Sequence, residues 1–300
     1  MNKLAIVIPY YNPDFFEETL KSVAAQTDKR FKLYIGNDAS PHDPLPLIQK
    51  YFPPRNYYYY DYKENLGGKN LALQWERILE NVKEDWFQIL GDDDVISENF
   101  VEEFYNNIEV IDSEKSNVVK YSQRWIDDTG APISSYSNYP KTLTPIENWE
   151  NKFINGDRSS LSEHIFRTIS YQKYKFKELL LAWGSDDIAI LEFSENKPII
   201  FIPKASVEIR ISNGNISGRS DNYNQKEIAM HYLEEFFITR YYKVLPKFYI
   251  VSKIQNQIKY AFQNSPTDLR INLFKIYLNL GEYKKIFLLP KLYYHLYSKK

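Results

Sequence analysis

Trp86-Phe87-Gln88-Ile89-Leu90-Gly91-Asp92-Asp93-Asp94 is an apolar segment that runs directly into three consecutive carboxylates. Short continuous apolar runs are typical of buried strands. Adjacent carboxylates repel one another by on the order of 1 kcal/mol per pair even in water. A protein that keeps three of them at a strand end therefore either binds a hard cation there, such as Mg²⁺ or Mn²⁺, or leaves a solvated acidic turn that caps the next helix.

Three earlier segments of the chain show the same succession of a strand and a polar turn. We expect strands at 4–9, 31–36 and 57–62, alternating with helices at about 14–26, 44–51 and 65–81. This order predicts an α/β protein with a parallel, doubly wound sheet, which binds ligands beyond the carboxyl ends of its strands. Polar groups follow all four strands, at Tyr10-Tyr11-Asn12, Asn37-Asp38, Asn65 to Lys69, and Asp92 to Asp94. The sequence therefore predicts one site at that edge of the sheet.

The second half of the chain is less regular. We expect a strand at 118–124, a long loop over 127–160 with a short helix near 145–153, a strand at 165–167, a helix at 188–193, and strands at 199–202 and 206–211. From about Tyr223 onward the pattern is mostly helical. We therefore predict two domains, an α/β domain at 1–220 and a basic, aromatic helical extension at 221–300.

Together these features resemble the family 2 glycosyltransferases, the inverting group with the GT-A fold, over approximately residues 3–218. Five segments carry the resemblance, namely Ile6-Val7-Ile8-Pro9-Tyr10-Tyr11-Asn12, Asn37-Asp38-Ala39-Ser40, Asn65-Leu66-Gly67, Asp92-Asp93-Asp94 and Asp186-Asp187. The chain departs from the family pattern where Asn37 and Ala39 replace an Asp and a Gly, and where Ser212 replaces a His. The Asp cluster allows two registers: Asp92 and Asp94 form a literal Asp-x-Asp, whereas alignment on Asp93-Asp94 places Gly91 at the family's usual first Asp.

The resemblance implies a GT-A (Rossmann-like), mostly parallel sheet flanked by helices, and it makes 1–220 the nucleotide-sugar-binding and catalytic domain. It also implies roles for particular residues. Asp187 would be the general base that takes the proton of the acceptor hydroxyl, with Asp186 assisting it. Asp92, Asp93 and Asp94 would hold Mg²⁺ or Mn²⁺ against the donor diphosphate. The nucleotide would be bound by Pro9, Tyr11, Asp38, Asn65, Gly67, Lys69, Asp92 and Arg210.

Each assignment has a purely structural alternative. Asp38 could form an Asx-turn or a helix cap before Pro41, and Lys69 could be a solvated lysine. The pair Asp186-Asp187 also suits a helix N-terminus, where the dipole favours acids.

The expected activity is transfer of a sugar from a nucleotide-diphosphate sugar, with a UDP-sugar favoured, to a hydroxyl of a glycan or lipid-linked acceptor in surface polysaccharide synthesis. One alternative is a non-catalytic nucleotide-sugar-binding protein of the same fold. An NAD-dependent dehydrogenase is disfavoured because Tyr10-Tyr11-Asn12-Pro13 follows the first strand in place of a Gly-x-Gly-x-x-Gly turn.

Composition and charge indicate where the protein acts. The chain has 300 residues and no cysteine, which excludes disulfides and thiolate metal sites and suits a reducing cytosol. No apolar run reaches the roughly 18 residues that span a bilayer. Because Met1-Asn2-Lys3 leads directly into a strand, we expect no signal peptide and a cytoplasmic location.

The charge is unevenly distributed along the chain. Residues 241–300 hold ten lysines and one arginine against two acids, so they carry +9, and the first 240 residues carry −10 of the total −1. A basic, aromatic segment suits an anionic membrane surface, nucleic acid, or a plain helical bundle with solvated lysines. We expect no nucleic-acid partner and favour peripheral contact with the inner face of the cell membrane. Oligomer formation stays open.

Overall fold

The computed structural model describes residues 3–212, 214–264 and 267–282. The chain divides into two compact units, Met1–Lys226 and Glu227–Lys300, with the boundary inside helix α9 (Tyr223–Tyr241). The division of activities that we predict at residue 220 stays a prediction. Residues 283–300, which belong to the predicted basic extension, lie outside the described residues.

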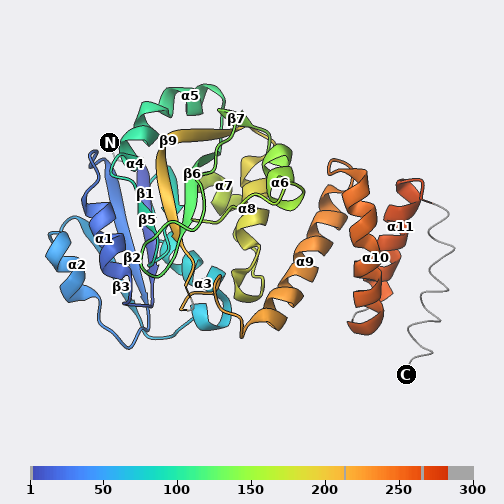
Figure 1. The fold of residues 1–300 in the computed structure, drawn as a ribbon, viewed down its shortest axis with the longest axis horizontal. Coiled ribbons are helices and arrows are strands. Elements are labelled where there is room, and N and C mark those ends of the chain that lie inside the picture. The colour runs from blue at the N-terminus through green and yellow to red at the C-terminus, as the bar shows by residue number, and fades with distance from the viewer. Residues whose placement is uncertain (1–2, 213, 265–266, 283–300) are drawn as a thin grey trace. The chain divides into compact units, whose positions relative to one another are not determined.

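The first part of the first unit alternates strands and helices as expected (Figure 1). Its elements are β1 (Leu4–Tyr10), α1 (Phe16–Ala24), β2 (Phe31–Asp38), α2 (Leu45–Tyr51), β3 (Tyr57–Tyr62), α3 (Gly67–Leu79) and β4 (Trp86–Ile89). All pairings among these four strands are parallel.

The second part of this unit completes the sheet in a mixed manner. Its elements are β5 (Val95–Ile96), α4 (Phe100–Asn106), α5 (Ile108–Ser113), β6 (Val118–Ile126), β7 (Thr142–Leu143), α6 (Pro145–Phe153), β8 (His164–Arg167), α7 (Thr168–Tyr174), the 3₁₀ turn η1 (Leu180–Ala182), α8 (Ser185–Ser194) and β9 (Ile199–Arg210). Among the described residues, the strand order is β3-β2-β1-β4-β8-β6-β9-β5, and β7 pairs with β9. β6 and β9 are parallel, whereas β8 runs antiparallel to both β4 and β6. The predicted class, an α/β sheet of GT-A type, is confirmed.

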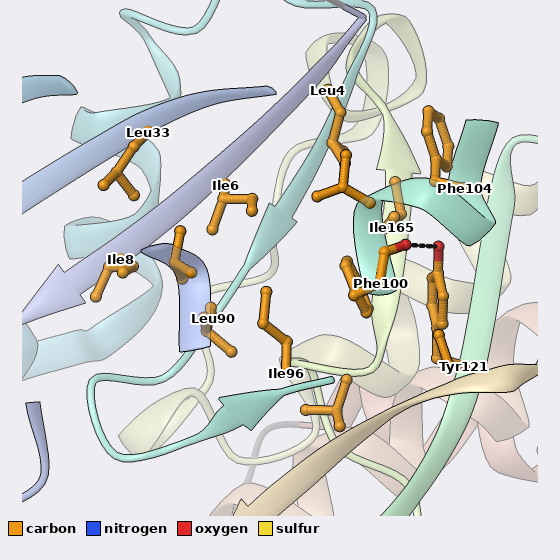
Figure 2. Close-up of a cluster of buried hydrophobic side chains, with 14 of the residues drawn as sticks. Leu4, Ile6, Ile8, Leu33, Leu90, Ile96, Phe100, Phe104, Tyr121 and Ile165 are labelled. Carbon is orange, nitrogen blue, oxygen red and sulfur yellow. Dashed lines mark hydrogen bonds between the residues drawn. The ribbon is translucent and has the colours of Figure 1, made fainter. Parts of the chain in front are cut away.

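Helices cover both faces of the sheet because β1 is apolar on both sides. Leu4, Ile6 and Ile8 face a cluster formed with α1, α2 and α4. Figure 2 shows these three side chains in the same cluster as Phe100 and Phe104 of α4. Ala5 and Val7 face a second cluster formed with α3, α7 and α8. All five of these β1 side chains are fully buried, and each large one stabilises the fold by roughly 1.5–3 kcal/mol.

The strand register brings the predicted polar turns to one edge of the sheet. Tyr10 pairs with Asn37, and Asn37 pairs with Asp61, so β1, β2 and β3 end together. Val7 pairs with Ile89, so β4 ends beside the end of β1. The loop that follows β4 and carries Asp92, Asp93 and Asp94, here called the aspartate loop, therefore begins at the same edge of the sheet. The pairing of the strands therefore determines where the backbone of the site lies.

Two expectations about individual elements need correction. The strands predicted at 199–202 and 206–211 form one strand, β9, in which residues 203–205 bulge out where the register shifts opposite Tyr121 and Ser122. A bulge tolerates Pro203, which cannot donate a ladder hydrogen bond. The helix predicted at 188–193 begins earlier, at Ser185, so the acidic pair lies in its first turn.

The second unit is helical. It contains most of α9 together with α10 (Lys247–Asn264) and α11 (Thr267–Asn279). Glu234 of α9 is bonded to Lys253 and Gln257 of α10, and the ring of His231 stacks on Tyr260 with 4.1 Å between centroids. In the part of the chain that the structure describes, no helix combines the length and apolarity needed to cross a membrane.

Candidate active site

The aspartate loop after β4 is bonded to the turn after β1. One carboxylate oxygen of Asp92, Oδ2, accepts hydrogen bonds from the backbone amides of Tyr11 and Asn12, each at 2.8 Å. The side chain of Tyr11 is 48% exposed at this turn. Asp92 therefore joins two of the four predicted polar turns.

The other two aspartates connect the loop to the second half of the unit. Asp94 is buried; its Oδ1 accepts from the backbone amide of Arg210 at 2.9 Å and its Oδ2 from the hydroxyl of Ser162. The Oδ2 of Asp93 accepts from the side-chain amide of Asn215 at 2.8 Å. A Cβ at Gly91 would lie 2.9 Å from Asp93 Oδ1 and 2.8 Å from Asp94 Oδ2. These two oxygens thus converge on the space that a larger residue at position 91 would fill.

The three carboxylates are electrostatically costly together. Burial and the charge of Asp93 raise the pKa of Asp92 to about 7. Burial also raises the pKa of Asp93, and burial together with Asp93 raises that of Asp94 well above its usual range. A cation beside the loop would offset this cost.

The residues present fit a metal ion shared with a substrate. Within residues 3–212, 214–264 and 267–282, no group of three His, Cys, Asp or Glu side chains is arranged to hold a metal. Mg²⁺, however, is usually held by one or two carboxylates, with phosphate and water oxygens completing its shell. Asp93 and Asp94, whose oxygens converge beside Gly91, supply such a pair.

Asp38 is engaged in a hydrogen-bond network of its own. It is buried, and its two oxygens accept from the backbone amides of Leu66 and Gly67, each at 2.8 Å. The guanidinium of Arg77 also bonds to it and lies 3.8 Å from the centroid of the Tyr62 ring. Burial raises the pKa of Asp38, while the two amides and Arg77 oppose the rise. The carboxylate therefore bonds the amides at the start of α3, a contact that differs from the local Asx-turn or helix cap before Pro41 given as the structural alternative.

The remaining nucleotide-binding candidates lie near the start of α3 or on β1. Pro9 is half-buried and pairs with Gly36 in the sheet. The side-chain oxygen of Asn65 accepts from the amide of Gly68. Lys69 is 67% exposed and forms an ion pair with Glu64. Their roles in nucleotide binding stay predictions.

Arg210 is enclosed by protein. Its side chain is fully buried, and its nitrogens donate to the backbone oxygens of Asp93 and Asp127, each at 3.0 Å, and to the carboxylate of Glu18. Its guanidinium carbon lies 4.1 Å from the centroid of the Phe15 ring. Through these contacts Arg210 holds the aspartate loop in place, and its predicted bond to phosphate stays a prediction.

The acidic pair lies in the first turn of α8. Asp187 is 7% exposed, and its Oδ1 is 2.6 Å from the Nζ of Lys152; Asp186 Oδ2 is 3.8 Å from the same nitrogen. Burial and Asp186 raise the pKa of Asp187 to about 7, although Lys152 opposes the rise. A carboxyl with that pKa can accept a proton near neutral pH.

Sequence reasoning missed the groups that surround Asp187. Lys152 comes from α6, and no local motif marks it. Lys120 on β6 is buried and donates to Asn148 at 2.8 Å; burial lowers its pKa to about 8. Glu163 is fully buried and accepts hydrogen bonds from Ser160. The charge of Glu163 raises the pKa of both Asp94 and Asp187. Glu163 therefore interacts with the aspartate loop and with the acidic pair.

A mixed sheet of this order, with carboxylates beyond the ends of its parallel strands and a separate buried acid, defines the GT-A class of nucleotide-sugar-binding folds. Residues 5–177 match the model of the family described as "Glycosyl transferase family 2". The chain belongs to this family. A search of curated proteins found no match.

Solved structures of S. aureus TarS share the fold. The TarS 1–349 structure in complex with UDP-GlcNAc has a TM-score of 0.61 and 17% identity, covering 93% of this chain and 80% of that one. Its complex with UDP gives 0.61 and 17%, covering 88% and 72%. Against the longer TarS structure the TM-score is 0.60 at 19% identity, and the match covers 89% of this chain but only 44% of that one.

Proposed function

We propose that this protein is an inverting glycosyltransferase that moves a sugar from a nucleotide-diphosphate sugar to a hydroxyl of a glycan or lipid-linked acceptor. The observation that carries the proposal is that the protein has two acidic sites, the aspartate loop and the buried Asp187. The aspartate loop lies at the carboxyl ends of β1 and β4, and the buried Asp187 has a pKa of about 7. A UDP-sugar is the proposed donor because TarS, which shares the fold, has been crystallised with UDP and UDP-GlcNAc.

The proposed chemistry is a direct displacement. Asp187 accepts the proton of the acceptor hydroxyl as that oxygen forms a bond to the anomeric carbon. The bond from that carbon to the diphosphate oxygen breaks on the opposite face, which inverts the configuration, and the nucleoside diphosphate leaves with the electron pair. Lys152, beside both acids, orients Asp187 and stays protonated.

Asp92, Asp93 and Asp94 are the proposed metal-binding residues, with Asp93 and Asp94 converging beside Gly91. When bound, Mg²⁺ or Mn²⁺ would stabilise the negative charge that grows on the leaving diphosphate. Pro9, Tyr11, Asp38, Asn65, Gly67 and Lys69 are proposed to border the nucleotide. We place the reaction in surface polysaccharide synthesis at the cytosolic face of the membrane, consistent with the basic extension.

Donor hydrolysis tests the proposal without knowledge of the acceptor. We expect UDP-GlcNAc or another UDP-sugar to be hydrolysed slowly in the presence of Mn²⁺. Asp187→Asn should lower the rate by about 10²–10⁴-fold, the usual contribution of general base catalysis. The matched control is Asp112→Asn, which alters surface ion pairs with Lys3 and Arg167.

The alternative, a non-catalytic nucleotide-sugar-binding protein, predicts a different result. Nucleotide would bind, no donor would turn over, and Asp187→Asn would change nothing. That result would overturn the enzyme proposal.

A further inference from the structure

Trp183 differs from the other tryptophans because it lies outside the hydrophobic core. The chain has five tryptophans, all within the described residues. Trp75, Trp86 and Trp149 are buried, and Trp125 packs against the first of the two core clusters. Among the residues that the structure describes, Trp183 alone of the five is half-buried and outside both clusters. Part of its indole is therefore accessible to a ligand.

The turn before α8 holds Trp183 close to the acidic pair. Leu181 and Ala182 have φ angles of 59° and 52°, and Gly184 has a φ of 88°. This left-handed backbone is unfavourable for residues with a side chain, so it persists only where the surrounding structure requires it, and it is concentrated at active sites and ligand clamps. Gly184 is the N-cap of α8. The indole therefore leaves the chain four residues before Asp187, at the same end of the helix.

A lysine lies over the face of this indole. The Nζ of Lys226 is 4.8 Å from the centroid of the Trp183 ring. The same nitrogen donates to the backbone oxygens of Ser217 and Arg219, at 3.2 Å and 2.9 Å. Contacts between an ammonium group and an aromatic face are weak where water reaches them. A ligand that packs on the indole can therefore replace the lysine there.

The segment 215–226, which carries this lysine, also reaches the aspartate loop. The side-chain nitrogen of Asn215 donates to Oδ2 of Asp93 at 2.8 Å. Contacts therefore run from the aspartate loop through this segment and Lys226 to the indole. Trp183 thus lies at the edge of the sheet where the proposed donor diphosphate binds.

The proposed base determines what kind of group approaches this indole. Asp187 takes a proton only from a hydroxyl within about 2.6–3.2 Å, so the group that carries this hydroxyl lies against the first turn of α8. One face of a pyranose ring consists of C–H groups, which pack on an aromatic face while the hydroxyls at the rim remain free to react. An acyclic polyol has no such face. A nucleotide base also stacks on aromatic rings, but Pro9 and Tyr11, at the end of β1, are its proposed site.

We propose that a sugar ring of the acceptor stacks on the indole of Trp183 and displaces Lys226 from it. The proposal rests on the glycosyltransferase function proposed above, because it assigns the chemical class of the acceptor in that reaction, a pyranose ring. It makes Trp183 a specificity-determining residue.

The test is saturation-transfer NMR of the full chain with UDP and Mg²⁺. The probes are the methyl β-glycosides of glucose, galactose and N-acetylglucosamine, with sorbitol as the acyclic comparison. At least one glycoside should bind more tightly than sorbitol, with the strongest saturation on the C–H protons of one ring face. Trp183→Leu should weaken this binding about tenfold, whereas Trp183→Phe keeps an aromatic face and should stay within about threefold.

Two further variants make the test specific. Lys226→Met should bind the glycoside equally well or up to about fivefold more tightly, because the lysine no longer competes for the indole. Trp125→Leu is the matched control. Trp125 is also half-buried and has the guanidinium carbon of Arg158 4.5 Å from its ring centroid, but it packs against the face of the sheet opposite α8. This variant should bind as the unaltered protein does.

Several results would overturn the proposal. They are equal binding of sorbitol, equal weakening by Trp125→Leu, loss of binding in Lys226→Met, and no binding of any glycoside. A large fall in the Tm of Trp183→Leu would also overturn it, because it would show that Trp183 is a structural residue.

Donor hydrolysis by the unaltered protein separates this proposal from the proposed function. Hydrolysis of a UDP-sugar without glycoside binding that depends on Trp183 would support the transferase and overturn the pyranose acceptor. Glycoside binding that depends on Trp183, without hydrolysis of any donor, would support the stacking site and contradict the transferase.

Discussion

At the residue scale, Lys152 is predicted to set the pH dependence of the reaction. Among the described residues, the charged groups that act on Asp187 include Asp186, Glu163, Lys120 and Lys152, and Lys152 donates a hydrogen bond to it at 2.6 Å. Since the base must be deprotonated to act, kcat/KM should rise with pH through an apparent pKa of about 7. Lys152 lowers the pKa of Asp187, so Lys152→Met should move this acid limb to higher pH by about 1 to 3 units.

Two further variants make that measurement specific. Lys152→Arg keeps a cation and should leave the acid limb near its original position. Lys173→Met removes a lysine that pairs with Glu195 and should change nothing. If Lys152→Met lowers activity equally at all pH values, Lys152 only supports the structure.

The same residues show how far sequence reasoning extends. Asp92, Asp93 and Asp94 directly follow an apolar strand, so their place at the sheet edge was predictable from local pattern. Lys152 meets Asp187 across 35 positions, which only the tertiary fold decides. Ala39 could be predicted only in part. The family motif has a glycine at this position, and the backbone of Ala39 keeps a φ of 54°, in the region that favours glycine, although its side chain differs.

At the element scale, Asp38 is predicted to stabilise the start of α3. Asp38→Ala would remove the acceptor for the amides of Leu66 and Gly67 and leave Arg77 without its carboxylate. We expect the free energy of unfolding to fall by about 1–3 kcal/mol, measured by urea denaturation of the nucleotide-free protein. Asp43→Ala removes an exposed Asx contact to Leu45 nearby and should cost less. Unchanged stability with lost UDP binding would instead show that Asp38 acts only on the nucleotide.

Elements whose signals are local were predicted well. The helix expected near 145–153 has those bounds as α6, because Thr144 and Glu147 form a capping box and Pro145 occupies the first turn. β9 was divided wrongly because Pro203 suggests the end of a strand. The bulge that accommodates it depends on pairing with β6, a partner about 80 residues earlier that the sequence around Pro203 does not indicate.

At the scale of the whole molecule, the charge asymmetry separates the two ends of the chain. The +9 on residues 241–300 is accompanied, among the described residues of the second unit, by exposed apolar side chains. Val244 is 58% and Phe248 66% exposed, and Lys243 and Lys247 lie beside them in sequence. Apolar side chains among lysines are typical of segments that bind the surface of anionic membranes.

The basic segment 241–300 is predicted to anchor the protein to anionic vesicles. We expect co-sedimentation with vesicles that contain phosphatidylglycerol, weakening with salt because each lysine near the surface contributes about 1 kcal/mol. The double variant Val244→Ser and Phe248→Ser should bind more weakly, and deletion of residues 243–300 should abolish binding. Ile169→Ser, which removes a side chain 68% exposed on α7, is the matched control. Equal binding to pure phosphatidylcholine vesicles, or binding that survives the deletion, would exclude the segment as an electrostatic anchor and leave its lysines as a solvated surface.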